Sequence, residues 1–276
     1  MVVDLAGLPD TGFLDLGDQK LEYRFAGPRP GEAPTLVLLH EGLGCVGLWG
    51  DFPQRLSDAG GVGVLAYSRA GYGQSSPVAL PRPLDYMTIE AQRVLPRVLD
   101  AIGFRHGLLV GHSDGASIAA IHAGSVHDPR IAGVVLIAPH FFTEDMGLAE
   151  IAQAKAMYED PASGLRERLA RWHTNVDVAF RGWNEAWLDP GFRAWNIAPF
   201  LDTIRVPVLV VQGADDQYGT QEQVRVVQRR CRSEVETVMM EGIRHSPHRE
   251  APNRLLAEIG TFARRVFGAR EARDHG

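Results

Sequence analysis

The sequence has few cysteines, no long hydrophobic run and no excess of positive charge. Its two cysteines, Cys45 and Cys231, lie far apart without a second Cys or His at metal-ligand spacing, which argues against a disulfide framework and a metal site. Apolar runs such as 131–139 are far shorter than the roughly 20 residues that span a bilayer, so we expect no membrane partner. The 28 Lys and Arg are outnumbered by 34 Asp and Glu, and the net charge of −6 opposes binding to nucleic acid.

The first ten residues do not have the pattern of a secretory signal. Acidic Asp4 and Asp10 follow Met1, where such a signal would have a basic segment and an apolar core. We therefore expect a cytoplasmic protein.

The chain is long and hydrophobic enough, at 276 residues and 45% hydrophobic content, to bury one sizeable core. Short apolar runs alternate with helical patterns, which is typical of a mostly parallel sheet covered by helices. We predict an α/β fold with an eight-stranded sheet. Its strands are expected at 13–16, 20–25, 35–40, 62–67, 106–112, 131–138, 206–212 and 235–239, and helices at 88–101, 116–127, 221–230 and 253–266.

The region 141–200 interrupts this alternation. It contains helix-forming residues and no convincing strand. Large aromatic side chains either fill the core of a small subdomain or line an apolar pocket, and both interpretations stay open here. Four of the five tryptophans of the chain lie in this region, namely Trp172, Trp183, Trp187 and Trp195.

The segment 111–115 reads GHSDG and has the form G-x-S-x-G. A predicted strand runs into it and a helix of small residues follows at once. Gly111 and Gly115 allow the tight turn that this connection needs. The beginning of the helix places backbone N–H groups beside Ser113, where negative charge develops during acyl transfer. Ser113 is therefore the candidate nucleophile.

Two further segments show a family resemblance. Segment 40–44 reads HEGLG after the third predicted strand, and segment 68–75 reads SRAGYGQS after the fourth. Together with the G-x-S-x-G turn, they make the chain resemble the serine-dependent α/β-hydrolase fold enzymes over nearly its whole length. The resemblance implies a core formed by residues 1–140 and 201–276 and a helical cap, or lid, formed by residues 141–200.

The resemblance also implies an oxyanion hole made by the backbone N–H groups of Gly42 and Asp114. Glu41 stands where the family more often has glycine, and it is either a surface carboxylate or one that lies behind the site. Ser68 takes the place of the family's Asp in segment 68–75, which we interpret as structural.

A serine nucleophile needs a base, usually His, and a carboxylate that orients the base. After the seventh predicted strand the chain reads GADD, and the family's G-x-x-D spacing selects Asp216, with Asp215 as the alternative one residue away. After the eighth strand the G-x-x-H spacing selects His245, with His248 as the competing histidine. The predicted triad is thus Ser113, Asp216 and His245.

Residues around this triad suggest substrate contacts. His140 ends the sixth predicted strand at the mouth of the expected pocket, and we predict that it contacts substrate together with Trp172, Trp183, Trp187 and Trp195. Cys45 follows segment 40–44 directly. No His or acidic residue lies around it at the spacing of a catalytic partner, and we interpret it as an apolar filler.

These residues predict a serine hydrolase that cleaves an ester or thioester of a small, hydrophobic or aromatic acyl group through an acyl-enzyme. A C–C bond hydrolase of diketones from aromatic ring cleavage is the alternative within the same fold. A ligand-binding protein without turnover is the alternative from another class. We expect a small-molecule substrate as the partner and no cofactor or metal, and the sequence leaves open whether the chain forms a homo-oligomer.

Overall fold

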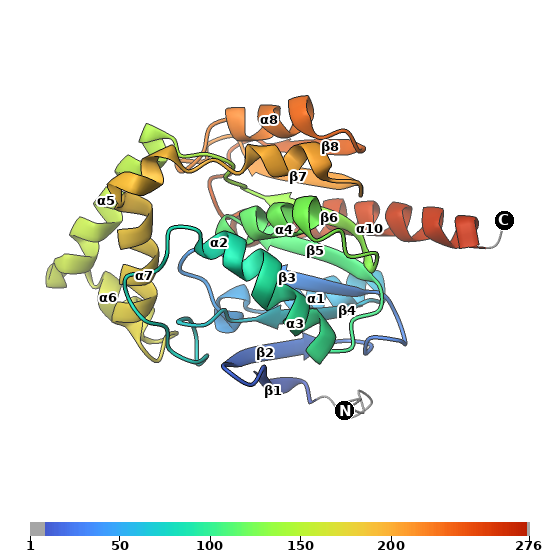
Figure 1. Ribbon diagram of the computed structural model, residues 1–276, viewed down its shortest axis with the longest axis horizontal. Coiled ribbons are helices and arrows are strands. Elements are labelled where there is room, and N and C mark those ends of the chain that lie inside the picture. Colours follow the sequence, from blue (N-terminus) through green and yellow to red (C-terminus); the bar gives the residue numbers. More distant parts are fainter. Residues whose placement is uncertain (1–8, 275–276) are drawn as a thin grey trace.

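The computed structural model describes residues 9–274, so the segment read above for a secretory signal lies mostly outside the described residues. Its centre is a mixed, mostly parallel eight-stranded sheet in the order β1-β2-β4-β3-β5-β6-β7-β8, which confirms the predicted fold class (Figure 1). The strands are β1 (Thr11–Asp15), β2 (Lys20–Ala26), β3 (Thr35–Leu39), β4 (Gly63–Tyr67), β5 (Gly107–His112), β6 (Ile131–Ile137), β7 (Val208–Gly213) and β8 (Val235–Met240).

The hydrophobic pattern of the strands reflects their place in the sheet. Every residue of β3, β4, β5 and β7 is buried, because helices cover both faces there, and these strands read as continuous apolar runs. β1 and β2 pair with each other as an antiparallel hairpin. From β4 to β8 the neighbouring strands pair in parallel, so their carboxyl ends meet at one edge of the sheet.

Helices pack on both faces of the sheet. α1 (Phe52–Gly60) and α10 (Pro252–Asp274) share one apolar cluster with one face of the strands. α3 (Leu95–Ala101), α4 (Asp114–Ser125) and α8 (Glu222–Arg230) pack on the other face. Among residues 9–274, none of the helices combines the length and the hydrophobicity needed to cross a membrane.

The predicted helix 88–101 differs from the observed structure. The helical region begins earlier, with α2 (Tyr86–Ile89), and Asp85 rather than Thr88 precedes its first turn. A π-helical turn at Glu90–Val94 leads into α3, where Pro96 lies in the first turn. Proline has no N–H to donate to the preceding turn, so the hydrogen-bond pattern changes ahead of it.

The region between β6 and β7 contains α5 (Asp145–Glu159), α6 (Leu165–Ala170) and α7 (Val176–Leu188). A short 3₁₀ turn joins α5 to α6, and two more follow α7. We call residues 141–200 the helical segment. An isolated antiparallel β-bridge between Phe142 and Asn196 brings the two ends of the segment together. In Figure 1 its helices stand to one side of the sheet, in yellow and green.

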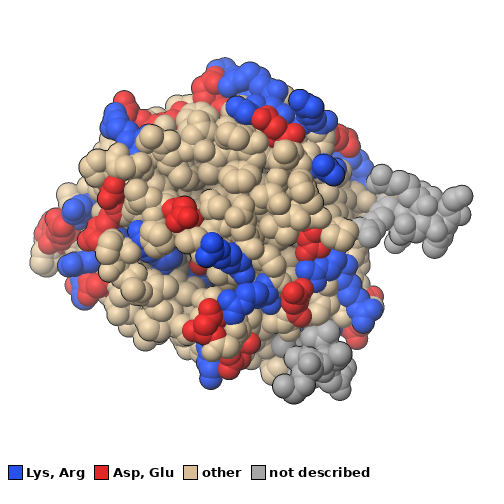
Figure 2. Space-filling view, viewed as in Figure 1, with Lys and Arg blue, Asp and Glu red and all other residues tan. Residues whose placement is uncertain are grey.

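Charged side chains of both signs lie around the rim and across the lower half of the face seen in Figure 2, and the upper centre is largely uncharged. The basic side chains of α8 gather at the top of that view. Arg225 and Arg229 pair with Glu222, and Arg230 pairs with Asp202. These carboxylates balance much of the positive charge of α8.

Candidate active site

Ser113 occupies a strained turn between β5 and α4. Its backbone has φ 54° and ψ −118°, outside the regions that non-glycine residues favour, and its side chain is 6% exposed. A Cβ added at Gly111 would lie 2.2 Å from the carbonyl oxygen of Gly115, and one at Gly115 would lie 2.0 Å from that of Leu39. The two glycines are therefore required for the close approach of strand, turn and helix.

His245 and Asp216 form a hydrogen-bonded pair beside this turn. Nδ1 of His245 lies 2.9 Å and 3.0 Å from the two carboxylate oxygens of Asp216. Because an ionised carboxylate can only accept, Nδ1 carries the proton and Nε2 is left with a lone pair. The carboxylate also accepts a hydrogen bond from the backbone N–H of Tyr218, at 2.9 Å.

The environment of Asp216 keeps it charged. Burial alone would raise its pKa, but the adjacent His245 and the hydrogen bond from Tyr218 outweigh burial and lower the pKa. Asp216 is 8% exposed, whereas the neighbouring Asp215 is exposed to solvent. The carboxylate that contacts His245 is thus the one selected by the spacing.

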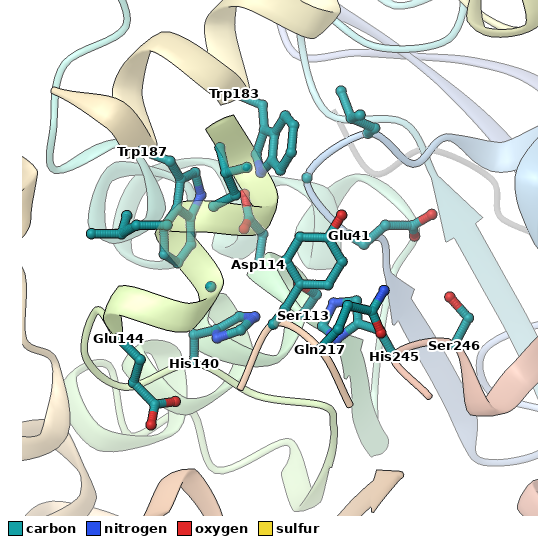
Figure 3. A pocket seen from close by; sticks show the side chains of 16 residues that line it. Glu41, Ser113, Asp114, His140, Glu144, Trp183, Trp187, Gln217, His245 and Ser246 are labelled. Atoms are coloured by element: carbon teal, nitrogen blue, oxygen red, sulfur yellow. The ribbon is translucent and has the colours of Figure 1, made fainter. Parts of the chain in front are cut away.

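Ser113 and His245 line the same cavity, whose volume is about 270 Å³ (Figure 3). Strands β3, β5, β6, β7 and β8 all contribute to it through the loops at their carboxyl ends, and α5 and α7 close it from the helical segment. Its walls consist of Glu41, Gly42, Leu43, Asp114, His140, Glu144, Gly147, Leu148, Ile151, Trp183, Trp187, Gln217, Tyr218 and Ser246.

The competing histidine lies elsewhere. His248 is buried against Trp49, with ring centroids 4.9 Å apart, and against His112, at 4.8 Å. Burial lowers its pKa to about 3, so it is neutral at physiological pH. It is a packing residue behind the cavity.

A model of the alpha/beta hydrolase family matches residues 36–259. This range includes all the residues that line the cavity. The chain belongs to this family.

Individual proteins are similar to this chain in sequence or in structure. It is 24% identical over 232 residues to the 2-hydroxy-6-oxo-6-phenylhexa-2,4-dienoate hydrolase of Comamonas testosteroni, a match that covers 74% of this chain and 77% of that protein. The enol-lactonase of Burkholderia xenovorans has a TM-score of 0.71 at 19% identity, over 91% of this chain and 99% of that one. An esterase from a Rhodococcus species has a TM-score of 0.70 at 21% identity, over 92% and 98%.

Two of the four tryptophans named from the sequence line the cavity of this alpha/beta hydrolase. Trp183 packs directly on segment 40–44, since a Cβ at Gly42 would lie 2.2 Å from its indole. Trp187 contacts His140, with ring centroids 5.4 Å apart. Trp172 is 45% exposed and covers Gly47 outside the cavity.

Trp195 does not line the cavity either. It stacks on Phe192, with ring centroids 5.0 Å apart and the ring planes 14° from parallel, and it lies behind Trp187 at 5.5 Å. The sequence named all four tryptophans together, and the structure divides them into two wall residues and two packing residues.

His140 lines the cavity as the sequence predicts. It is 6% exposed, and its ring lies 5.6 Å from that of His245. Burial lowers its pKa to about 3, with a smaller contribution from the charge of His245. His140 is therefore a neutral polar side chain in the cavity wall at physiological pH.

Cys45 does not reach the cavity. It is buried, its Sγ faces the carbonyl oxygen of Trp172 at 3.9 Å, and burial raises its pKa to about 11. A thiol with that pKa stays protonated and is a poor nucleophile. No cluster of three or more potential metal-ligating side chains occurs in the part of the chain that the structure describes.

Glu41 and His112 form a second carboxylate–imidazole pair, behind His245. His112 Nε2 lies 2.7 Å from the carbonyl oxygen of His245, and its Nδ1 lies 3.4 Å from a carboxylate oxygen of Glu41. Burial alone would raise the pKa of Glu41, but His112 holds it well below its usual value. Of the two interpretations of Glu41, the structure shows the carboxylate behind the site.

We expect Glu41→Gln to lower the free energy of unfolding by about 1–3 kcal/mol at pH 7, because it removes the charged partner of buried His112. A depressed pKa stabilises the fold above the unfolded value of about 4.3, and this contribution is lost as the pH falls through the folded value. Urea unfolding should therefore show a gap between wild type and variant that narrows below about pH 4.3.

Glu258→Gln on α10 is the matched control, and it should change the free energy of unfolding by less than about 0.5 kcal/mol. Equal stability of Glu41→Gln and wild type at pH 7 would show that the pair does not stabilise the fold.

Proposed function

We propose that the protein is a serine hydrolase that cleaves an ester or thioester of a small, hydrophobic or aromatic acyl group. The observation that carries this proposal is the strained Ser113 turn in one cavity with the hydrogen-bonded pair of His245 and Asp216. The cavity of about 270 Å³ lies just below the range of roughly 300–1,000 Å³ of drug-sized ligand sites, which favours a small substrate.

The proposed reaction has two halves. Ser113 Oγ attacks the acyl carbon while His245 Nε2 takes its proton, and Asp216 stabilises the resulting imidazolium. The N–H groups of Gly42 and Asp114 stabilise the tetrahedral oxyanion. His245 then gives the proton to the leaving alcohol or thiol, and water hydrolyses the acyl group from Ser113 by the same route.

The helical segment acts in this proposal as a cap that selects the acyl group. Leu148 and Ile151 of α5 and Trp183 and Trp187 of α7 provide apolar walls opposite the turn that carries Ser113. A cap of this kind changes substrate selection without disturbing the residues that react.

We expect Trp183→Ala and Trp187→Ala to raise KM for bulky acyl esters by an amount equivalent to about 1–3 kcal/mol, because each removes apolar contact with the acyl group. The change should be smaller for acetyl esters. Trp172→Ala, outside the cavity, is the control and should leave KM within about twofold. Equal losses for acetyl and bulky substrates would contradict a substrate-selecting cap.

C–C bond hydrolysis is the second candidate, and the similarity to the dienoate hydrolase of Comamonas testosteroni favours it. A dienoate carries a carboxylate. Glu144 already places a carboxylate in the cavity wall, and its charge opposes a second one. We therefore expect neutral esters to be the better substrates.

A substrate panel tests the proposal. It contains p-nitrophenyl esters from acetyl to octanoyl, aryl esters, acyl thioesters and a ring-cleavage dienoate. Highest kcat/KM for a short or aromatic ester or thioester supports the proposal, and preference for the dienoate supports the alternative. Absence of turnover, together with no labelling of Ser113 by a fluorophosphonate, would support a ligand-binding protein instead.

A further inference from the structure

A buried arginine lies between the two loops that supply the proposed oxyanion donors. Arg69 follows β4 and is 1% exposed. Its guanidinium donates to the carbonyl oxygens of His40, at 2.5 Å, and Glu41, at 3.1 Å, and lies 4.0 Å from the carboxylate of Asp114. Burying a guanidinium costs free energy unless its partners are well placed, so this position is held from several sides.

The contacts of Arg69 fix the direction of the Gly42 N–H. The carbonyl oxygen of Glu41 accepts from Arg69, from His40 Nδ1 at 2.7 Å and from the Gly44 N–H at 3.1 Å. A peptide bond is planar and trans, so its N–H points away from its C=O. Three donors on this oxygen therefore hold the Gly42 N–H on the opposite side of the same peptide plane.

His40 is held in one tautomer by the same arginine. The backbone N–H of Arg69 donates to His40 Nε2 at 3.0 Å, so the proton of the neutral ring lies on Nδ1. Burial, with the nearby Arg69 charge, holds the pKa of His40 well below its usual value. The ring thus stays a neutral donor to the Glu41 carbonyl oxygen.

The other proposed donor, the Asp114 N–H, belongs to a residue whose side chain is anchored in the same network. Tyr86 Oη donates to the Asp114 carboxylate at 2.5 Å, and Trp187 Nε1 donates to Tyr86 Oη at 3.1 Å. All of these side chains are buried. The network therefore runs from a tryptophan of the cavity wall to both sides of the proposed oxyanion hole.

We propose that Arg69 is a positioning residue that sets the oxyanion hole, by fixing the Gly42 peptide through two carbonyl oxygens and the Asp114 side chain through its charge. This inference rests on the proposed serine hydrolase function. Arg69 does not touch the substrate, and its effect falls on the transition state, in which the oxyanion forms, rather than on substrate binding.

Arg69→Lys tests the proposal, because lysine keeps the charge but cannot bond both carbonyl oxygens as a planar fork does. We expect kcat on the best ester of the panel to fall about 10- to 100-fold with KM within about threefold. The rate of Ser113 labelling by a fluorophosphonate should fall in the same proportion as kcat/KM. The phosphonylation of Ser113 uses the same N–H donors to stabilise its developing oxyanion.

Arg82→Lys is the matched control. Arg82 is also buried and stacks over Tyr72, 4.7 Å from the ring centroid, and over Tyr86, at 5.7 Å. It donates to the carbonyl oxygen of Ala70 rather than to segment 40–44. Both Arg82→Lys and Arg69→Lys should lower the Tm, but Arg82→Lys should leave kcat within about twofold of wild type. Tyr86→Phe removes a single hydroxyl and gives a second measurement if Arg69→Lys does not fold. We expect it to lower kcat about 3- to 10-fold without a change in KM.

The outcomes separate this inference from the proposed function. A kcat within twofold of wild type for Arg69→Lys, or for Tyr86→Phe where the first variant does not fold, would overturn the positioning role. Labelling of wild-type Ser113 would then still support the serine hydrolase. Failure of wild type to be labelled or to turn over any ester would overturn both.

Discussion

Ser113→Ala should lower kcat on the best ester by at least about three orders of magnitude, because it removes the covalent step and leaves only binding and oxyanion stabilisation. The change removes one oxygen from a side chain that is already nearly buried, so little packing is lost. The Tm of the variant should stay within a few degrees of wild type, as measured by calorimetry. A kcat near that of wild type would exclude Ser113 as the nucleophile.

Ser125→Ala provides the control for this substitution. Ser125 lies at the far end of α4, and its hydroxyl donates to the carbonyl oxygen of Ile121 at 2.6 Å. Ser125→Ala removes the same atom at the other end of α4 without touching the cavity. We expect its kcat to equal that of wild type within about twofold, which would assign the loss in Ser113→Ala to the reacting hydroxyl.

Asp216→Asn and His245→Ala should each lower kcat by about four orders of magnitude. Asparagine in place of Asp216 donates a hydrogen bond as well as accepting one, so it no longer fixes the proton on His245 Nδ1. Alanine at 245 removes the base. Steady-state kinetics of the single and double variants should show little further loss when either change is combined with Ser113→Ala, since the three residues act as one unit.

Neighbouring residues of the same types provide the controls for the acid and the base. Asp215→Asn alters an exposed carboxylate next to Asp216 and should leave kcat nearly unchanged. His248→Ala empties part of the packing around Trp49, so it should lower the Tm and have little effect on kcat. A severe loss of kcat in Asp215→Asn with a mild one in Asp216→Asn would show that the assignment is wrong by one residue.

The positions of the strands along the chain were largely predictable because buried parallel strands read as uninterrupted apolar runs. The predicted strand 106–112 coincides with β5 to within one residue at its beginning, and 235–239 differs from β8 only at its end. Boundaries of helices were less predictable. Thr88 is a good capping residue locally, yet the helix begins at Tyr86, whose side chain is buried beside Asp114 and Trp187.

Residues of the candidate site differ in how far the sequence could place them. Ser113, Asp216 and His245 follow strand ends at fixed spacings. These spacings can be read from the sequence without knowledge of the tertiary packing. No local pattern separates Trp183, which lines the cavity, from Trp172, which does not. The difference depends on which side of the helical segment packs on segment 40–44.

The network around Arg69 was beyond the sequence for a related reason. Its contacts join loops after β3, β4 and β5 with α2 and α7, which are far apart in the chain and meet only through tertiary packing. The sequence indicated only that segment 68–75, which contains Arg69, has a structural role. A charged side chain within that turn gave no indication that it would be buried.

Trapping the acyl-enzyme tests the central claim most directly. Wild-type protein is mixed with an excess of its best p-nitrophenyl ester, quenched in acid during turnover and measured by intact-protein and peptide mass spectrometry. The account predicts a mass increase equal to one acyl group, located on Ser113 and absent from Ser113→Ala. Turnover by wild type with Ser113 unmodified at every quench time, or an acyl group on another residue such as Cys45, would contradict it.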